Sequence, residues 1–277
     1  DLDLLDLFIG SEGTLGLISE VEVRLVPAPE SSCAVMTFWT GEAAALAFTR
    51  AVRRQRSELG VEAIEYFGPR ALRFLRSYRD AHGASSGVPA CLPEEADCAV
   101  YLDLGTSRKK LHEGLRRLAH MVEACGGDTA LTWSAHEKSE RETLRLFRHA
   151  LPEAVNSRIS QIRRVFPEVT KLGTDMAVPD EALRTILATY RKELGKAGLE
   201  YVIFGHIGDN HLHVNILPET PEQYEVGKEL YLEFASQVVE LGGSPAAEHG
   251  IGKLKVPFLR VLGGDEGLAE MRSVKRA

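Results

Sequence analysis

The chemistry of this chain is densest in residues 205–215, which read Gly205-His206-Ile207-Gly208-Asp209-Asn210-His211-Leu212-His213-Val214-Asn215. The second half of this stretch is predicted to be a strand. Because side chains alternate along a strand, His211, His213 and Asn215 are expected on one face. The two glycines allow a tight turn before the strand. The stretch therefore predicts a hairpin that returns His206 toward His213.

A second motif follows at residues 248–252 and reads Glu248-His249-Gly250-Ile251-Gly252. With His206 and His213, Glu248 completes a set of two imidazoles and one carboxylate. Such a set leaves coordination positions open, as a catalytic site for a divalent metal requires. We therefore expect His206, His213 and Glu248 to hold a divalent ion such as zinc, manganese or iron.

A simpler interpretation of the hairpin stays open. Histidines in a polar hairpin are often solvated or hydrogen-bonded to the backbone, and this holds for any one of them taken alone. It is less attractive for three histidines that lie close together and are followed by a Glu-His pair at a glycine-rich turn. The role of His211 is left open between a supporting group, an additional ligand and no role.

Composition is typical of an ordinary globular protein. With 277 residues, 44% apolar and 26% charged, the chain has enough apolar residues for one large core or two smaller ones. Its net charge of -7 argues against a general nucleic-acid binder. No apolar run approaches the ~20 residues that a membrane span needs. We therefore expect no nucleic-acid partner and no membrane span.

The four cysteines, at 33, 91, 98 and 125, show no CxxC spacing. A chain of this size does not need disulfides to hold its core, so we expect reduced thiols and a cytoplasmic protein. The first residues carry neither an initiator methionine nor a targeting signal, and the last ones form no closing element. The sequence is therefore expected to be a fragment of a longer protein.

A glycine-punctuated loop occurs near the start, where residues 8–18 read Phe8-Ile9-Gly10-Ser11-Glu12-Gly13-Thr14-Leu15-Gly16-Leu17-Ile18. Its glycines let backbone N–H groups approach a ligand, and its polar side chains add hydrogen-bonding groups for a ribose or a phosphate. An alternating strand is predicted over 21–25, before the stop Pro27-Ala28-Pro29. By itself, a glycine-rich turn before a strand is more often only a turn.

Together with the strand and the Pro-x-Pro stop, this loop resembles the end of the FAD-binding domain in flavoproteins of the vanillyl-alcohol-oxidase type. Residues 204–215 and 248–253 resemble the C-terminal half of the FAD-linked D-lactate, glycolate and D-2-hydroxyglutarate dehydrogenases. The three motifs stand in the order of that family, and the resemblance spans residues 8–277. One departure is Asn210-His211, where the family usually carries Gly-Asn.

The pattern from Ser32 to Trp133 reads strand, helix, strand, helix, strand, helix, strand. Two such split units predict an α+β fold with an antiparallel sheet covered on one face by helices. With the resemblance, this gives a ferredoxin-like substrate-binding cap domain at 30–245. Residues 1–29 would be the end of a FAD-binding domain, and 246–277 a segment that returns to the flavin site.

The resemblance implies FAD-dependent oxidation of a small D-2-hydroxy acid to the 2-keto acid, with hydride transfer to the flavin and assistance from the metal. In this interpretation His249 is the general base, and Asn215 adds a hydrogen bond near the metal. The FAD contacts are expected from the loop residues Gly10, Ser11, Glu12, Gly13, Gly16 and Ile18.

Arg148 is the first candidate for the substrate carboxylate. A helix is predicted over 135–156, and basic residues near its end would interact favourably with the helix dipole without any further role. The alternative is a guanidinium fork on a carboxylate, which is the role of an arginine at about this place in the resembled family. Lys171, at the start of a strand predicted over 171–179, is a second candidate, since it could point to the same face as the family's lysine two residues later.

Two other classes of function stay open. A metal-dependent hydrolase would use the same ligands, and a non-catalytic module that binds small acids would keep only the α+β layer. The loop at 10–16 argues against both, because neither needs a turn that cradles a dinucleotide. The electron acceptor is unknown. If the acceptor lies in a membrane, it would place this cytoplasmic enzyme at the membrane periphery. The oligomeric state is open, with a homodimer among the options.

Overall fold

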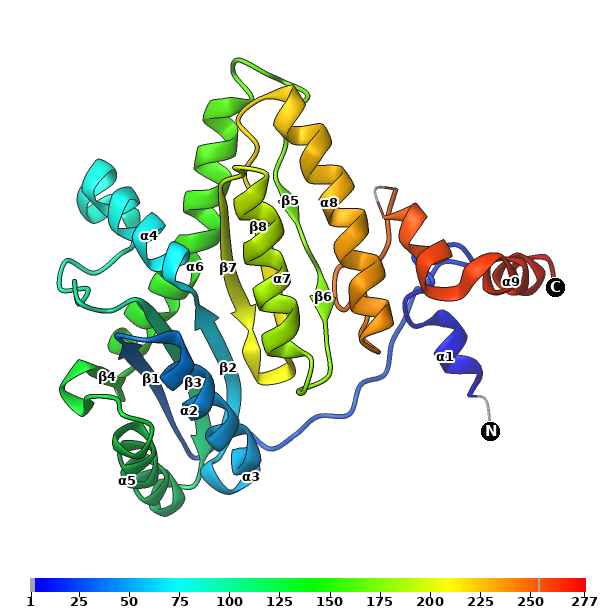
Figure 1. Ribbon diagram of the computed structural model, residues 1–277. Coiled ribbons are helices and arrows are strands. Elements are labelled where there is room, and N and C mark those ends of the chain that lie inside the picture. Colours follow the sequence, from blue (N-terminus) through cyan, green and yellow to red (C-terminus); the bar gives the residue numbers. More distant parts are fainter. Residues whose placement is uncertain (1–2, 254) are drawn as a thin grey trace.

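The computed structural model describes residues 3–253 and 255–277. In this part of the chain, one antiparallel sheet has the strand order β4-β1-β3-β2-β7-β8-β5, and the short β6 pairs with β8 (Figure 1). The strands are β1 Ser31–Trp39, β2 Val61–Phe67, β3 Cys98–Thr106, β4 Thr132–Ala135, β5 Leu172–Gly173, β6 Met176–Ala177, β7 Tyr201–His206 and β8 His211–Ile216. The predicted α+β class with an antiparallel sheet is confirmed.

Helices pack on both faces of the sheet. The helices are α1 Leu4–Phe8, α2 Glu42–Arg54, α3 Arg56–Leu59, α4 Pro69–His82, α5 Arg108–Ala124, α6 Lys138–Ile162, α7 Leu183–Lys196, α8 Pro221–Glu240 and α9 Val256–Arg276, with 3₁₀ turns η1 Gly83–Ser86, η2 Thr129–Leu131 and η3 Ile207–Asp209. Buried residues of α2, α5, α7 and α8 belong to one hydrophobic cluster, and those of α4 and α6 to the other.

Strand β1 shows why both faces need cover. Cys33 and Val35 belong to the first cluster, Ala34 and Met36 belong to the second, and all four side chains are buried. A strand that is apolar on both sides requires a helical layer on each side. The expectation that helices cover one face was therefore wrong in this detail, since α4 and α6 cover the second face.

The sheet divides into an N-terminal half, β4-β1-β3-β2, and a C-terminal half, β7-β8-β5 with β6. Strands β2 and β7 join the halves, and their paired positions are Tyr66 with Gly205 and Phe67 with Phe204. These positions lie at the end of β2 and near the end of β7. The junction therefore brings the last residues of β2 next to the histidine end of the hairpin.

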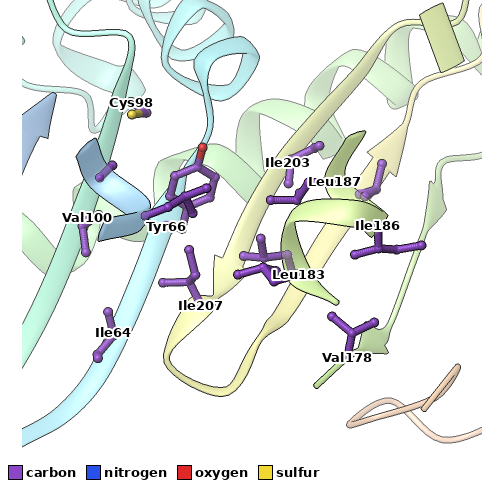
Figure 2. Close-up of a cluster of buried hydrophobic side chains, with 14 of the residues drawn as sticks. Ile64, Tyr66, Cys98, Val100, Val178, Leu183, Ile186, Leu187, Ile203 and Ile207 are labelled. Atoms are coloured by element: carbon purple, nitrogen blue, oxygen red, sulfur yellow. The ribbon is translucent and has the colours of Figure 1, made fainter. Parts of the chain in front are cut away.

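Helix α7 packs over this junction. Its buried residues Leu183, Ile186 and Leu187 follow the spacing of an amphipathic helix. Figure 2 shows them beside Ile203 of β7 and Ile207 in the turn that follows. Burying an aliphatic side chain of this kind stabilises a fold by about 1.5–3 kcal/mol. These three side chains pack α7 onto the hairpin, which is part of the sheet.

Helix α6 is longer than predicted. The expected end was near Asn156, but the helix continues through Pro152 to Ile162. A proline inside a helix removes one backbone hydrogen bond. Burial of the following turn, including Val155, offsets this loss because the helix lies across the second hydrophobic cluster. Arg148 therefore lies inside the helix and not at its negative end.

Two predicted strands were wrong in detail. Residues 21–25 form no strand; they are exposed and have no pairing partner in the described chain. Alternation alone does not make a strand, because the backbone groups of a strand need a neighbouring strand. The strand expected over 171–179 is divided into β5 and β6. Thr174 and Asp175 lie in the gap, and both are buried.

Helix α9 packs on the sheet through α8, and the rings of Phe258 and Tyr231 lie 4.9 Å apart in an edge-on arrangement. A residue with positive φ, Gly264, kinks α9 in its middle. Within the part of the chain that is described, no helix is both long enough and apolar enough to cross a membrane.

Candidate metal and substrate site

The hairpin places three histidines on one face of the sheet. His206 pairs with His211 across the two strands, and Phe204 pairs with His213, so alternation puts all three imidazoles on the same side. One donor atom from each histidine and one from Glu248 lie within 4.8 Å of one another. The structure thus brings together the three predicted metal ligands, His206, His213 and Glu248, and adds His211.

The backbone conformation of the hairpin leaves room for the histidine rings to converge. Gly205 has φ 124°, and a Cβ at this position would lie 2.8 Å from the His213 ring. Only glycine leaves room for that ring. Asn210 has φ 51°, a left-handed conformation that asparagine tolerates better than most residues. Its side chain accepts a hydrogen bond from Arg53 at 2.8 Å, which fixes the end of the turn.

Two of the histidines have one ring nitrogen held by an oxygen acceptor. Nδ1 of His206 lies 2.9 Å from Oε1 of Glu65, and Nδ1 of His213 lies 2.9 Å from the carbonyl oxygen of Thr174. An acceptor at Nδ1 keeps the ring proton there and leaves the Nε2 lone pair free. Metal-binding histidines usually have such an outer partner. Both rings are therefore prepared to bind a cation through Nε2.

The third histidine, His211, is 3% exposed and contacts two carboxylates. Its Nε2 lies 3.0 Å from Oδ1 of Asp175, and its Nδ1 lies 3.6 Å from Oε1 of Glu248. The Nε2 atom has no aligned hydrogen-bond partner among the described residues. The other oxygen of Glu248 lies 3.3 Å from Nε2 of His206. Glu248 thus reaches two of the three imidazoles.

Asp175 fixes the returning segment against the hairpin. It is fully buried and accepts hydrogen bonds from the backbone N–H groups of Glu248 at 3.0 Å and His249 at 2.9 Å, and from Lys255 at 2.7 Å. Burial alone would raise the pKa of Asp175. The contacts with His211, Lys255 and the two backbone groups outweigh it and hold the pKa well below its usual range. Asp175 is therefore a carboxylate, and it sets the position of Glu248.

The environments of His206 and His213 differ. The hydrogen bond with Glu65 raises the pKa of His206, although burial opposes this. Burial lowers the pKa of His213, and the neighbouring histidines add to the effect. His213 is therefore the neutral imidazole that a cation requires. At His206, a proton competes with the cation for the Nε2 lone pair.

A cavity of about 670 Å³ opens beside the histidines. Its wall includes every histidine predicted for the site, the three substrate candidates, and an apolar group made of Phe67, Phe204, Tyr224, Tyr231, Leu232 and Phe258. A concave site with an apolar wall and a few convergent polar groups is typical of small-molecule binding.

The substrate candidates line this cavity in different states. Arg148 is paired with Glu65 at 2.5 Å, which is the same carboxylate that holds His206. Lys171 donates to Oδ1 of Asn156 at 2.9 Å, and burial lowers its pKa. Asn215 is buried on β8, opposite Gly173. All three reach the cavity, and Arg148 is the one tied to the histidine cluster through Glu65.

His249 is the most exposed of the predicted site residues on the returning segment, with 64% of its side chain accessible. Its ring stacks on His213 with centroids 5.2 Å apart, and its Nδ1 lies 3.9 Å from Oδ1 of Asp175. The side chain thus lies at the cavity, beside the donor cluster and free to exchange protons.

The glycine-rich loop meets the same segment through Glu12. Its carboxylate accepts N–H groups of Ile251 at 2.5 Å and Gly252 at 2.7 Å, and these bonds lower its pKa. A Cβ on Gly250 would lie 2.5 Å from this carboxylate and would displace the Glu12 side chain, and the φ of 65° at Gly250 also disfavours a larger residue. The other predicted FAD contacts, Gly10, Ser11, Gly13, Gly16 and Ile18, lie in the loop and are exposed or partly exposed. The loop is thus tied to the turn after Glu248 through Glu12.

Sequence reasoning missed two carboxylates, Glu65 and Asp175. Glu65 is a buried acid between the buried residues Ile64 and Tyr66, which is unusual and signals a partner. Asp175 lies in the strand predicted over 171–179, from which only Lys171 was expected at the site. Both hold histidines of the hairpin by contacts between distant parts of the chain.

The family of this chain follows from comparison with known proteins. Residues 28–277 match the family described as "FAD linked oxidases, C-terminal domain". The chain therefore belongs to this family, as the motifs predicted.

Individual relatives agree with this assignment. Glycolate oxidase subunit GlcD of Bacillus subtilis is 26% identical and covers 99% of this chain, which in turn spans 54% of GlcD. D-2-hydroxyglutarate dehydrogenase of Xanthomonas citri pv. viticola is 28% identical, again with 99% of this chain and 54% of the relative. The chain thus spans about half the length of the curated relatives it matches.

A solved structure supports the fold. The structure of p-cresol methylhydroxylase superposes with a TM-score of 0.65 at 12% identity, over 91% of this chain and 51% of that one. At this identity the likeness concerns the fold alone. The chain thus has the architecture of a C-terminal domain in flavoenzymes of this kind.

Proposed function

We propose that the intact protein oxidises a small D-2-hydroxy acid to its 2-keto acid, with FAD as hydride acceptor and a divalent ion held by His206, His213 and Glu248. The observation that supports this most is the convergence of these donors beside a cavity that also receives Arg148. The names of the relatives make glycolate, D-lactate and D-2-hydroxyglutarate the first substrates to test.

The domain division belongs to the same proposal. Residues 1–29 would end a FAD-binding domain, 30–245 would bind the substrate, and 246–277 would return to the flavin. When bound, FAD would supply a hydride acceptor for the α-carbon hydrogen, and the divalent ion would supply a positive charge that lowers the pKa of the substrate hydroxyl. The residues of this chain that touch the flavin would come from the loop around Glu12, which contacts the turn after Glu248.

Each cavity residue then has a defined task. Arg148 would hold the substrate carboxylate with the N–H groups that Glu65 does not use, since a guanidinium carries five donors. Asn215 would donate to a substrate oxygen, and Lys171 would add positive charge to the lining of the cavity. His249 would accept the hydroxyl proton at Nε2 while Asp175, near Nδ1, stabilises the protonated ring.

The first experiment concerns the flavin. The intact protein should be yellow, and anaerobic addition of a D-2-hydroxy acid should bleach the visible flavin absorbance, whereas the L-enantiomer should not. A protein that holds no flavin after reconstitution would contradict the proposal and favour a metal-dependent hydrolase with the same donors. If the protein binds flavin but no 2-hydroxy acid reduces it, the family assignment stands and the proposed substrate class is wrong.

The second experiment separates proton transfer from binding. His249→Ala should lower kcat by ~10²–10⁴ while metal is retained, because a positioned general base typically contributes that much. Arg148→Ala should raise KM more than it lowers kcat, since it removes a contact made in both ground and transition states. If His249 only packs in its turn, its replacement will lower thermal stability and leave turnover per folded molecule unchanged.

The protein is further proposed to act in the cytoplasm on small acids, with an electron acceptor of unknown identity. The four thiols are free cysteines in the structure, two of them buried. This is compatible with a reducing compartment. Cell fractionation of the intact protein, with and without high salt, would test both a cytoplasmic location and a peripheral association with the membrane.

A further inference from the structure

We propose that His211 is a fourth protein ligand of the metal, which it binds through Nδ1, so that the ion is held by three imidazoles and one carboxylate. This inference rests on the proposed metal site and is independent of the flavin chemistry. It concerns a residue for which the sequence left the role open.

The first support is where His211 lies. It is the first residue of β8, directly opposite His206, and it is on the same face as His213. Ring centroids are 5.5 Å apart for His206 and His211, and 4.5 Å apart for His211 and His213. An imidazole within 5.5 Å of both other rings, and only 3% exposed, is already inside the donor cluster.

The second support is the separation of the donor atoms. Glu248 lies 3.3 Å from Nε2 of His206 and 3.6 Å from Nδ1 of His211, so its carboxylate bridges them almost symmetrically. Ligand atoms about 2.1 Å from one ion lie about 3.0–3.4 Å apart when they occupy neighbouring positions. Small side-chain adjustments would place Glu248, His206 and His211 at ligand distance from one ion.

The third support is the partner on the far side of the ring. Asp175 lies 3.0 Å from Nε2 of His211, as Glu65 lies beside His206 and the Thr174 carbonyl beside His213. The buried Nε2 of His211 has no aligned hydrogen-bond partner in the described residues, although the carboxylate is within reach. A cation on Nδ1 would hold the proton on Nε2 and turn the ring toward Asp175.

This donor set selects the kind of ion. A zinc ion with four protein ligands is closed, whereas catalytic zinc usually keeps three protein ligands and an open position. An ion that accepts six ligands, such as Fe²⁺ or Mn²⁺, keeps two positions open beside three imidazoles and a carboxylate. Two neighbouring open positions suit the hydroxyl and carboxylate oxygens of one 2-hydroxy acid. We therefore infer a six-coordinate divalent ion.

The test uses Co²⁺ as the probe, because its visible absorption reports both binding and coordination number. The metal-free intact protein is titrated with Co²⁺ as wild type, His211→Asn, His206→Asn and His149→Asn. His149 lines the same cavity but lies outside the donor cluster, so it is the matched control. We expect His211→Asn to weaken Co²⁺ binding by more than the ~10–100-fold that loss of an outer partner costs, and to change the spectrum. His149→Asn should match wild type.

The outcomes separate this inference from the proposed function. If His211→Asn binds Co²⁺ with wild-type affinity and spectrum while His206→Asn loses Co²⁺ binding, His211 is not a ligand and the three-ligand site stands. No Co²⁺ binding by wild type would overturn both. If His211→Asn does not fold, X-ray absorption of the wild-type Co²⁺ protein decides the matter by counting imidazoles: three are expected, and two would overturn the inference.

Discussion

The N-terminal and C-terminal halves of the sheet are built from the same kinds of elements, yet they differ in what they bury. In the N-terminal half, β1 and β3 bury apolar side chains on both faces. In the C-terminal half, β7 and β8 bury apolar side chains on the α7 face and present His206, His211 and His213 on the other. The N-terminal half is thus apolar on both faces, whereas one face of the C-terminal half carries the candidate site.

The halves meet through one carboxylate. Glu65 lies at the end of β2, next to the junction, and holds both Arg148 and His206. Since a lone buried carboxylate would be costly, its two partners explain how an apolar strand can carry it. Glu65 is thus the contribution of the N-terminal half to the site. The comparison predicts that core truncation and site substitution have separable effects.

The largest expected effect is on stability. Phe48 on α2 is fully buried against Trp39, with ring centroids 5.1 Å apart. Phe48→Ala should lower the free energy of unfolding by about 3–5 kcal/mol, measured by denaturant titration. Co²⁺ affinity of the folded fraction should not change. Phe8→Ala, at an exposed site, is the matched control and should stay within about 0.5 kcal/mol of wild type. A parallel loss of metal affinity in Phe48→Ala would show that the halves are not separable.

An intermediate effect is expected at the junction. Glu65→Gln keeps the side-chain volume and removes the charge, so metal affinity should fall by ~10–100-fold, as for other outer partners. Glu62→Gln, at an exposed position of the same strand, is the matched control. Wild-type metal affinity in Glu65→Gln would show that the N-terminal half does not contribute to metal binding.

The same variant makes a prediction about pH. Glu65 raises the pKa of His206 in the folded protein, so His206 should titrate at lower pH in Glu65→Gln, measured by NMR on the metal-free protein. A raised pKa stabilises the fold fully below the unfolded value, about 6.5, and this stabilisation is lost as pH rises through the folded pKa. The stability difference between wild type and Glu65→Gln should therefore be largest in mild acid and shrink in mild alkali. A difference independent of pH would contradict the pairing.

The smallest effect is expected at the cysteines, all of which lie outside the C-terminal half. Burial raises the pKa of Cys33 to about 11 and that of Cys98 to about 12, whereas Cys91 is exposed. At mildly alkaline pH, iodoacetamide should label Cys91 in the native protein and reach Cys33 and Cys98 only after unfolding. The labelled protein should keep its stability and metal affinity. Cys91→Ser is the control, and rapid native labelling of Cys98 would contradict the burial.

The sequence predicted the features that local rules determine. Strand alternation and the glycine turn were enough to expect that His206 and His213 face one another, and the structure confirms this arrangement. Glu248 was expected to complete the donor set with these two histidines, and its carboxylate does lie 3.3 Å from Nε2 of His206. The roles of these residues stay predictions.

Features that depend on distant contacts were not predictable. Glu65 is 141 positions from His206, and nothing in β2 itself says which strand will pair with it. Helix α6 was expected to end near Asn156, but packing across the sheet carries it to Ile162. Residues 21–25 alternate as a strand does, yet no partner strand is present in the described chain. In each case the presence or absence of a distant partner decided the outcome.

The contact between Glu12 and Gly252 joins residues 240 positions apart. Closing so long a loop from an open chain is entropically expensive, but β1 begins at Ser31 and Ser244 is already bridged to Ala177. Once the sheet has formed, only about 30 residues remain to be closed, and each halving of loop length saves about 0.6 kcal/mol. The order of events follows from this entropy. We expect the sheet to form first and the glycine-rich loop to meet the turn after Glu248 afterwards.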